Sequence, residues 1–222
     1  VKAMREAKLT TDWADPDEEH ERAVRRFIAG LYRSEAFLAE LEAFVAEVAR
    51  RGEAAALGQT LLKLTAPGVP DLYQGDELWC RSLVDPDNRR PVDWERRRRL
   101  LAGLIAGEPP TRETAKLFLI HRALDLRGRR ADAFEGGYRP LDAGNDAFAF
   151  ARGDAVIAAM PLRPGGPGRI AVPEDLRGRW RDVLDDRGVE LGSEATLADL
   201  AGALPVALLE RAAHEGGDTI SR

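Results

Sequence analysis

The densest group of polar and aromatic residues in this 222-residue sequence lies between positions 73 and 94. It begins with Tyr-Gln-Gly-Asp-Glu-Leu-Trp at 73–79 and continues with Asp-Pro-Asp-Asn-Arg-Arg-Pro-Val-Asp-Trp at 85–94. Proteins recognise sugars with planar hydrogen-bonding groups, which pair with neighbouring hydroxyls, and with aromatic rings, which cover the apolar face of a pyranose. Both kinds of group occur together here. The segment is therefore a candidate sugar-binding site; the alternative is a salt-linked loop that only supports its neighbours.

Two adjacent carboxylates in this segment, Asp76 and Glu77, do not form an acid–base pair by themselves. Neighbouring side chains of an extended chain point in opposite directions, so the two groups would not converge on one bond. Glycoside chemistry needs two facing carboxyl groups, about 5–5.5 Å apart for retention and about 6.5–9.5 Å apart for inversion. A sequence alone cannot show whether two carboxyl groups face each other, and no residue here stands out as a nucleophile.

A second candidate binding segment lies near the N-terminus, where the basic stretch Lys2–Lys8 is followed by Trp13. Arg5 and Lys8 are three residues apart and would share one face of a helix. From that face they could bind sugar hydroxyls or neutralise a carboxylate. The alternative is an exposed basic helix face.

Composition and charge argue against several other functions. The net charge is −5, and the run Arg96–Arg99 lacks interleaved aromatic residues, so we expect a solvated helix face and no nucleic-acid partner. Cys80 is the only cysteine and the three histidines are far apart, which predicts no disulfide, no metal and no cofactor. No apolar run approaches the ~20 residues that span a bilayer, which predicts no membrane partner and, with the single cysteine, a cytoplasmic location.

The elements before the candidate loop have the apolar spacing of helices. Acidic residues at 15–19 begin the first, Ser34 precedes the second, and Gly52 is expected to end the second. A third apolar stretch ends at Pro67, and a short buried strand is expected at Val69–Tyr73. The predicted helices are one that starts within 15–19 and has an apolar stripe to Leu31, one that follows Ser34 and has its stripe from Phe37 to Val48, and further helices at 54–64, 95–105 and 111–126, with a loop at 74–93.

After Gly136 the sequence has the pattern of short strands separated by Gly and Pro. The strands are expected at 147–151, 155–160, 169–172, 180–184, 189–191 and 206–209. The first two form a hairpin around Gly153, and the set predicts a small antiparallel β-sandwich. We place a boundary within 127–135, which divides the chain into domains 1–130 and 131–222. The fold class is therefore α+β.

The residues around the loop also carry a resemblance to a known family. Lys-Leu-Thr-Ala-Pro-Gly-Val-Pro-Asp-Leu-Tyr-Gln-Gly-Asp-Glu-Leu-Trp at 63–79 and Ser-Leu-Val-Asp-Pro-Asp-Asn-Arg-Arg-Pro-Val-Asp at 82–93 resemble the maltooligosyltrehalose synthases of the α-amylase superfamily. Lys2–Lys8 with Trp13, and Asp199–Leu209, resemble further segments of that family in the same order. Cys80 and Asp76 depart from it, since the family usually has Asp and often Thr at these positions.

The resemblance implies that Val69–Tyr73 is the last strand of an incomplete (β/α)₈ barrel, followed by a C-terminal β domain. It implies an enzyme that converts the reducing-end α-1,4 linkage of a maltooligosaccharide to an α,α-1,1 linkage by a retaining, intramolecular transfer. The catalytic Asp, Glu and Asp of the family lie upstream of the matching segments. The expected substrate-binding residues are Tyr73, Gln74, Glu77, Asp87, Asn88, Arg89, Arg5, Lys8 and Trp13.

Because the chain lacks those carboxylates and does not begin with Met, we expect it to be the inactive C-terminal part of such an enzyme. Its partners would be a maltooligosaccharide and the N-terminal remainder of the polypeptide. One alternative is a carbohydrate-binding module, with exposed aromatics such as Trp180 near the ligand. Another is a structural role, which predicts a large exposed apolar patch on the helices.

Overall fold

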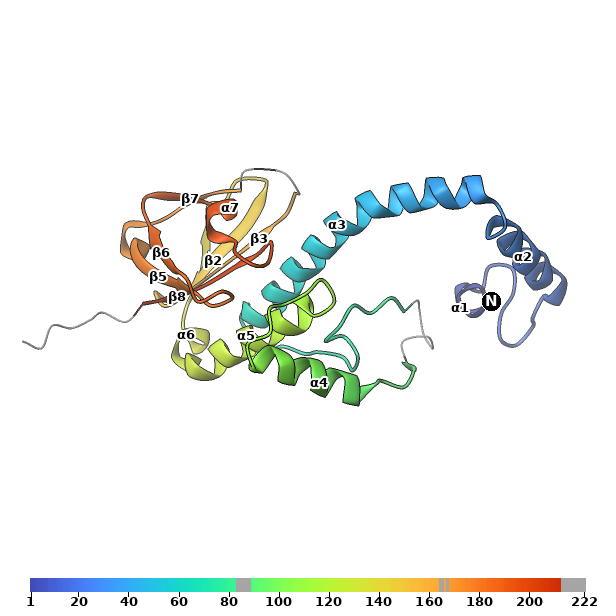
Figure 1. Ribbon diagram of the computed structural model, residues 1–222, viewed down its shortest axis with the longest axis horizontal. Coiled ribbons are helices and arrows are strands. Elements are labelled where there is room, and N and C mark those ends of the chain that lie inside the picture. The colour runs from blue at the N-terminus through green and yellow to red at the C-terminus, as the bar shows by residue number, and fades with distance from the viewer. Residues whose placement is uncertain (83–88, 164–165, 167, 213–222) are drawn as a thin grey trace, which may run out of the picture.

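The structure is a computed structural model that describes residues 1–82, 89–163, 166 and 168–212. It has the predicted α+β composition, with helices in the first part and antiparallel strands in the second. Figure 1 shows the long helix α3 leading from α1 and α2 to a body in which α4, α5 and a sheet lie together. The helices are α1 (Lys2–Ala7), α2 (Glu18–Leu31), α3 (Glu35–Thr65), α4 (Trp94–Ile105), α5 (Ala115–Arg129), α6 (Ala131–Glu135) and α7 (Leu197–Leu200), with a 3₁₀ turn at Glu174–Leu176.

Three of the helices begin at side-chain caps that the sequence makes visible. The carboxylate of Asp17 accepts a hydrogen bond from the main-chain nitrogen of His20 at the start of α2, and the Ser34 hydroxyl accepts one from Phe37 at the start of α3. The carboxylate of Asp93 caps α4 in the same way. Such caps satisfy main-chain N–H groups that have no partner within the helix.

Helix α3 corrects the prediction that Gly52 ends a helix. It runs without interruption to Thr65 and joins the predicted second and third helices. A glycine inside a helix costs about 1 kcal/mol relative to alanine. Burial of Leu57, Leu61 and Leu64 in the next turns outweighs that cost, because each buried leucine contributes about 1.5–3 kcal/mol.

The predicted strand at Val69–Tyr73 is wrong for this chain. These residues are extended but belong to no sheet. A strand requires neighbouring strands to hydrogen-bond with its main chain, and all strand pairs among the described residues lie beyond residue 137. The segment instead leaves α3 and leads into the loop, which the structure confirms as irregular where it is described.

All predicted strands after Gly136 are confirmed, and two further short strands are present. They are β1 (Tyr138–Leu141), β2 (Ala147–Arg152), β3 (Val156–Pro161), β4 (Arg169–Ala171), β5 (Gly178–Asp182), β6 (Gly188–Leu191), β7 (Glu194–Thr196) and β8 (Ala207–Arg211). Six form an antiparallel sheet in the order β1-β2-β3-β8-β5-β6, and β4 pairs with β7. In the predicted hairpin β2–β3, Phe150 pairs with Ala158 and Ala149 with Ala159.

The six-stranded sheet has a hydrophobic cluster on each face. Alternate residues of β2 and β3, such as Phe150 and Ala158, join leucines of α3 and α5 in one cluster, while Ala149 and Ala159 join β4 and α7 in the other. The two-stranded sheet β4–β7 lies with α7 on one face of the six-stranded sheet, and helices α3 and α5 lie on the other. Helix α3 lies so close to β3 that a side chain at Gly58 would lie 3.3 Å from Met160. No helix in the described part combines the length and apolar content that a membrane crossing requires.

Candidate functional site

The first half of the candidate loop is held by one arginine of α4. The Arg97 guanidinium donates from Nε to Glu77 Oε2 at 2.8 Å, from Nη2 to the main-chain oxygen of Gly75 at 2.8 Å, and from Nη1 to that of Asp93 at 3.2 Å. The side chains of Arg97 and Glu77 are 16% and 21% exposed. One guanidinium thus connects the first part of the loop to Asp93, the residue that caps the following helix.

The main chain between Tyr73 and Asp76 forms a tight turn. The Asp76 nitrogen donates to the Tyr73 oxygen at 3.0 Å, and Gly75 has φ +92. A positive φ at the third position of a turn favours glycine, as in a type II turn. A side chain at Gly75 would also lie 3.3 Å from Val92 and 3.6 Å from Arg97 Nη2. The backbone conformation therefore favours glycine there, and a side chain would make a tight contact with Val92.

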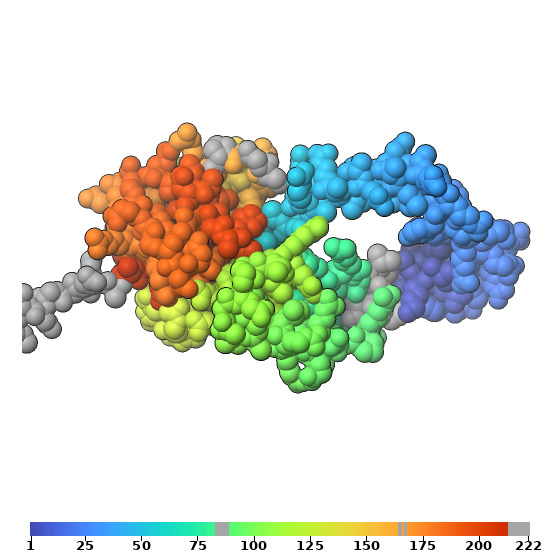
Figure 2. Space-filling view, viewed as in Figure 1, coloured from blue at the N-terminus to red at the C-terminus, as the bar shows by residue number. Residues whose placement is uncertain are grey.

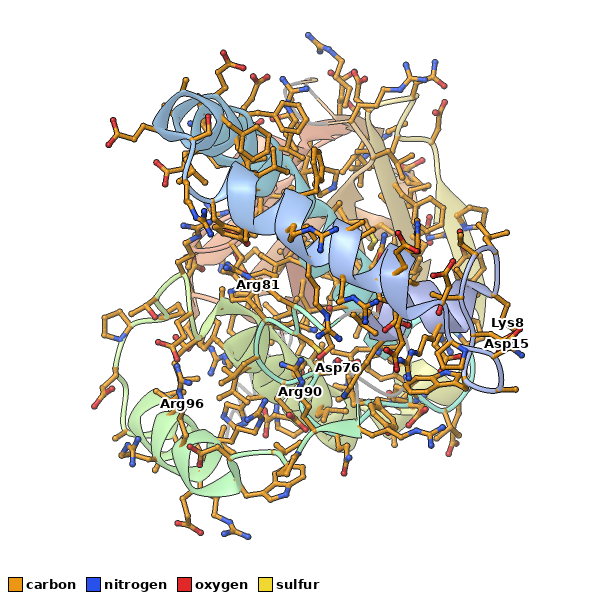
Figure 3. The ribbon with its side chains drawn as sticks, turned by 90° about the vertical axis from the view of Figure 1, so that its right-hand side faces the viewer. Lys8, Asp15, Asp76, Arg81, Arg90 and Arg96 are labelled. Carbon is orange, nitrogen blue, oxygen red and sulfur yellow. The ribbon has the colours of Figure 1, made fainter. Side chains whose placement is uncertain are left out.

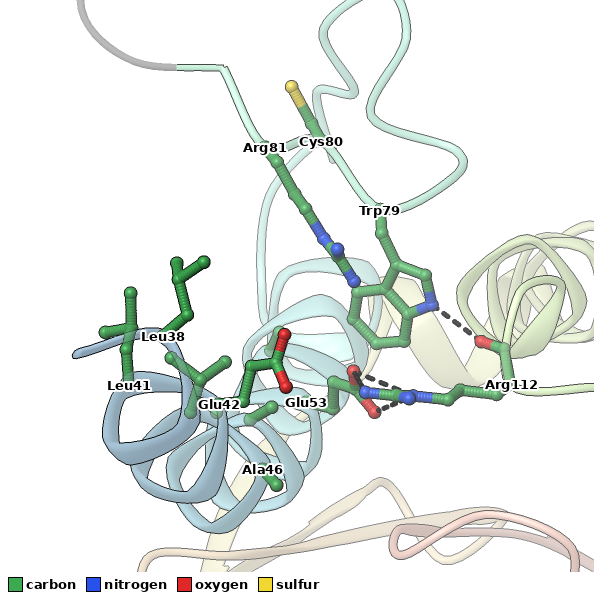
Figure 4. A pocket seen from close by; sticks show the side chains of 13 residues that line it. Leu38, Leu41, Glu42, Ala46, Glu53, Trp79, Cys80, Arg81 and Arg112 are labelled. Carbon is green, nitrogen blue, oxygen red and sulfur yellow. Dashed lines mark hydrogen bonds and ion pairs between the residues drawn. The ribbon is translucent and has the colours of Figure 1, made fainter. Parts of the chain in front are cut away.

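Trp79 connects the next part of the loop to α3 through Arg112. Its indole Nε1 donates to the main-chain oxygen of Arg112 at 2.6 Å. Arg112 in turn binds Glu53 of α3 through both carboxylate oxygens, with nitrogen–oxygen distances from 2.6 to 3.0 Å. The hydrogen bond from Arg112 lowers the pKa of Glu53. Figure 4 shows this ion pair below the Trp79 ring.

A groove of about 790 Å³ lies between α3 and the segment Trp79–Arg81. Leu38, Leu41 and Val45 of α3 form one side, and Trp79 and Arg81 form the other. In Figure 4 the Arg81 side chain extends beside Trp79 toward the helix. The groove is open and its walls are mainly apolar.

The predicted N-terminal residues form a unit of their own around a buried carboxylate. Glu21 is 3% exposed and accepts hydrogen bonds from Arg5 Nε at 2.7 Å, Arg5 Nη2 at 2.9 Å and the Thr11 hydroxyl at 2.8 Å. The Arg5 hydrogen bonds lower the pKa of Glu21 to about 2. Arg5 also lies over the Trp13 ring, 5.3 Å from its centroid, and the Trp13 indole donates to Glu6 at 2.9 Å.

This N-terminal unit adjoins the start of α3, whereas α5 and the sheet lie at the other end of that helix (Figure 1). In Figure 3, Lys8 and Asp15 are well apart from Asp76 and Arg90 of the loop. Lys8 follows α1 in a left-handed conformation with φ 54. The structure thus brings Arg5 and Trp13 together but does not place them beside Tyr73.

Comparison with known proteins gives a consistent result over nearly the whole chain. It is 37% identical, in an alignment of 220 positions, to a protein named as a maltooligosyl trehalose synthase from Mycobacterium tuberculosis, and the alignment covers 95% of the chain and 27% of that relative. The structure of maltooligosyltrehalose synthase from Arthrobacter ramosus superposes with a TM-score of 0.81 at 36% identity, over 95% of the chain and 29% of that structure. The chain matches a C-terminal part of maltooligosyltrehalose synthase. A structure from Sulfolobus tokodaii, titled as a hypothetical maltooligosyl trehalose synthase, superposes with a TM-score of 0.75 at 28% identity, over 95% of the chain and 28% of that structure. No family model matches the chain.

The chain therefore spans between a quarter and a third of the length of the maltooligosyltrehalose synthases that it matches. The resemblance stated from the motifs at 63–79 and 82–93 is confirmed. The matching part contains the predicted loop, the helices around it and the antiparallel sheet.

Of the predicted sugar-binding residues in the loop, Tyr73, Gln74 and Arg89 are exposed, with Tyr73 47% exposed. Asp87 and Asn88 lie outside the described residues. The local geometry favours Tyr73 and Gln74 as side chains available to a ligand, since both occupy the turn that Gly75 shapes. Their role as sugar ligands stays a prediction.

Glu77, also predicted to bind sugar, has one oxygen engaged by Arg97. The expectation that Arg96–Arg99 form one solvated face is wrong for Arg97, whose side chain faces the loop. A signal was present in the sequence: Asp93 caps the helix, and helical side chains lean toward the N-terminus, so a residue one turn inside is directed at the preceding loop.

Lys116, in the first turn of α5, is a second residue that the sequence did not single out. Burial lowers the pKa of its amine, and the carboxylates of Asp76 and Glu77 act in the opposite direction. The lysine therefore lies within electrostatic range of the turn that holds Tyr73 and Gln74.

Among the described residues, no group of three or more His, Cys, Asp or Glu is placed to hold a metal ion.

The two alternative functions predict different surfaces. Trp180, which a carbohydrate-binding module would expose, is 1% exposed, and its indole donates to the Leu176 oxygen at 2.9 Å, so it belongs to the core. In contrast, α2 and α3 do expose large apolar side chains. This α2–α3 apolar surface consists of Phe27, Ile28, Tyr32, Phe37, Leu41, Phe44, Val45 and Val48.

Proposed function

We propose that this chain is the C-terminal part of a maltooligosyltrehalose synthase and supplies one wall of its sugar-binding site. This proposal is supported by a sequence identity of 36–37% to such enzymes along 95% of the chain, and by a structural superposition with a TM-score of 0.81. The reaction would convert the reducing-end α-1,4 linkage of a maltooligosaccharide to an α,α-1,1 linkage, with water kept away from the intermediate.

In this proposal the chain binds and orients the sugar but performs no bond-breaking step. The Tyr73 ring covers an apolar sugar face, and the Gln74 amide hydrogen-bonds to neighbouring hydroxyls. The catalytic Asp, Glu and Asp come from the N-terminal remainder of the polypeptide, which acts in the cytoplasm. Residues 1–130 would complete its barrel, and residues 131–222 would form the C-terminal β domain.

The α2–α3 apolar surface supports the remainder of the polypeptide as the partner. Phe27, Tyr32 and Phe44 are 67%, 73% and 65% exposed, although each would gain about 1.5–3 kcal/mol from burial. Exposed apolar side chains gathered on adjacent helices mark contact surfaces. The surface continues into the groove beside Trp79 through Leu41. Figure 2 shows open space beneath the N-terminal half of α3.

The test compares the isolated chain with the full-length polypeptide that contains it. Loss of reducing ends from maltopentaose reports formation of the α,α-1,1 linkage. We expect turnover by the full-length protein, none by residues 1–222, and a KM raised about 5- to 30-fold by Tyr73→Ala because a stacking contact of about 1–2 kcal/mol is removed. Leu162→Ala, a change at an exposed residue of the β region, is the control. Turnover by residues 1–222 alone would refute the proposal.

A further inference from the structure

We infer that Arg97 is the positioning residue of the proposed sugar site: it sets the backbone turn that presents Tyr73 and Gln74. This inference rests on the proposed function. Its basis is the threefold contact of one guanidinium with the Glu77 carboxylate and the main-chain oxygens of Gly75 and Asp93.

The contacts of Arg97 differ from those of its neighbours in the same helix. Arg96 pairs with Glu113 where the side chains are 51% and 48% exposed, and Arg98 pairs with Glu95 where they are 73% and 82% exposed. Exposed pairs of this kind contribute little to stability. The Arg97–Glu77 pair is largely shielded from water, so its hydrogen bonds compete less with solvent.

The geometry also requires the arginine fork. Nε and Nη2 lie on the same edge of the guanidinium, and they bind Glu77 and Gly75, which are two residues apart. A lysine ammonium provides a compact charge without this planar arrangement of donors. The pair of contacts therefore defines where the Gly75 peptide lies as well as neutralising Glu77.

Gly75 provides independent support for close positioning. Its φ is +92, and any side chain at this position would lie within 3.6 Å of both Val92 and Arg97, so the turn packs against α4 and the end of the loop. Because Tyr73 and Gln74 precede Gly75 in the same turn, displacement of the Gly75 peptide moves both. Glu77 then acts on the sugar through Arg97 and the turn.

The experiment uses the full-length polypeptide with Arg97→Gln, Arg97→Lys and, as matched control, Arg98→Gln. Steady-state kinetics with maltopentaose separate KM from kcat, hydrogen–deuterium exchange follows residues 73–79, and thermal unfolding checks the fold. We expect Arg97→Gln to raise KM about 10-fold, equivalent to one shielded charged hydrogen bond, while kcat changes less than about twofold. Exchange should accelerate at 73–79 and stay unchanged in α5 and the sheet.

Arg97→Lys should give an intermediate KM, since it keeps the charge opposite Glu77 but loses the contact with Gly75. If Arg97→Gln does not fold, this milder variant provides the same comparison. A KM within twofold of the parent value, or unchanged exchange at 73–79, would overturn the role of Arg97. Absence of turnover by the parent enzyme would instead refute the proposed function, so the two failures are distinguishable.

Discussion

Arg152 of β2 donates a hydrogen bond from Nη1 to the main-chain oxygen of Thr65, the last residue of α3, at 3.0 Å. Its Nη2 donates to the main-chain oxygens of Phe134 and Gly136 near the end of α6. Arg152 is 2% exposed, and the three oxygens that accept these hydrogen bonds belong to main-chain carbonyl groups, not to a carboxylate. The C-terminal carbonyls of a helix carry partial negative charge, which stabilises a buried cation there. Arg152 thus joins the helical and β parts of the chain.

Replacement of Arg152 by methionine should lower the free energy of unfolding by about 2–4 kcal/mol, because it leaves buried carbonyl groups without their charged donor. Urea unfolding followed by circular dichroism measures this change. Arg139→Met is the matched control, since Arg139 binds Asp175 at the surface and should contribute less than about 1 kcal/mol. Equal effects of the two substitutions would contradict the role of Arg152.

The N-terminal unit should depend on the ionisation of Glu21. Its pKa of about 2 lies below the ordinary 4.5, so its stabilising effect is complete above about pH 4.5 and is lost as the pH falls toward 2. Glu21→Gln should release Arg5 and Trp13 at neutral pH as well. The Trp13 indole N–H resonance in NMR spectra reports this release. Glu18→Gln, which removes only an exposed pair with Arg22, should leave the resonance in place.

The turn between β5 and β6 should give the opposite pH dependence. Asp182 is fully buried, and burial raises its pKa from 3.8 to about 6. A raised pKa means that the folded state holds the proton more tightly. The free energy of unfolding should therefore fall as the pH rises from about 4 to about 6, by at most about 1.4 kcal/mol per pH unit.

Asp182→Asn should flatten this part of the stability profile in urea titrations at several pH values. The amide keeps an oxygen for the Leu184 nitrogen, which now donates to Asp182 Oδ1 at 2.8 Å. Asp186→Asn, at an exposed position of the same turn, is the control and should retain the slope. A slope that persists in Asp182→Asn would show that another group is responsible.

The isolated chain should self-associate through the α2–α3 apolar surface. Sedimentation velocity measures this, and the double substitution Phe44→Asp and Val48→Asp should shift the chain toward monomer, because both side chains lie on one face of α3 at i and i+4. Val69→Asp is the control: Val69 is 95% exposed but lies outside that surface. A monomeric parent chain would argue against this surface as a contact site.

The sequence predicted much of the local structure. The acidic residues at 15–19 and Ser34 indicated where two helices begin, and the apolar runs on either side of Gly153 indicated a buried hairpin; both signals depend on residues close together in the chain. The motif at 63–79 indicated the family for a similar reason, since it is continuous. Tyr73 and Gln74 could therefore be proposed as sugar ligands before their arrangement was known.

Other features depended on contacts between distant residues. Gly52 stays inside α3 because the following leucines pack against α5 and the sheet, and Val69–Tyr73 is no strand because none of the described strands lies beside it. Neither result can be predicted from the spacing of residues along the sequence. Likewise, the Asp93 cap indicates that an arginine one turn into α4 is directed at the preceding loop, but only the fold shows that Arg97 binds Gly75 and Glu77. Local patterns define caps and periodicity, whereas packing and hydrogen bonding across the fold decide which side chain reaches which partner.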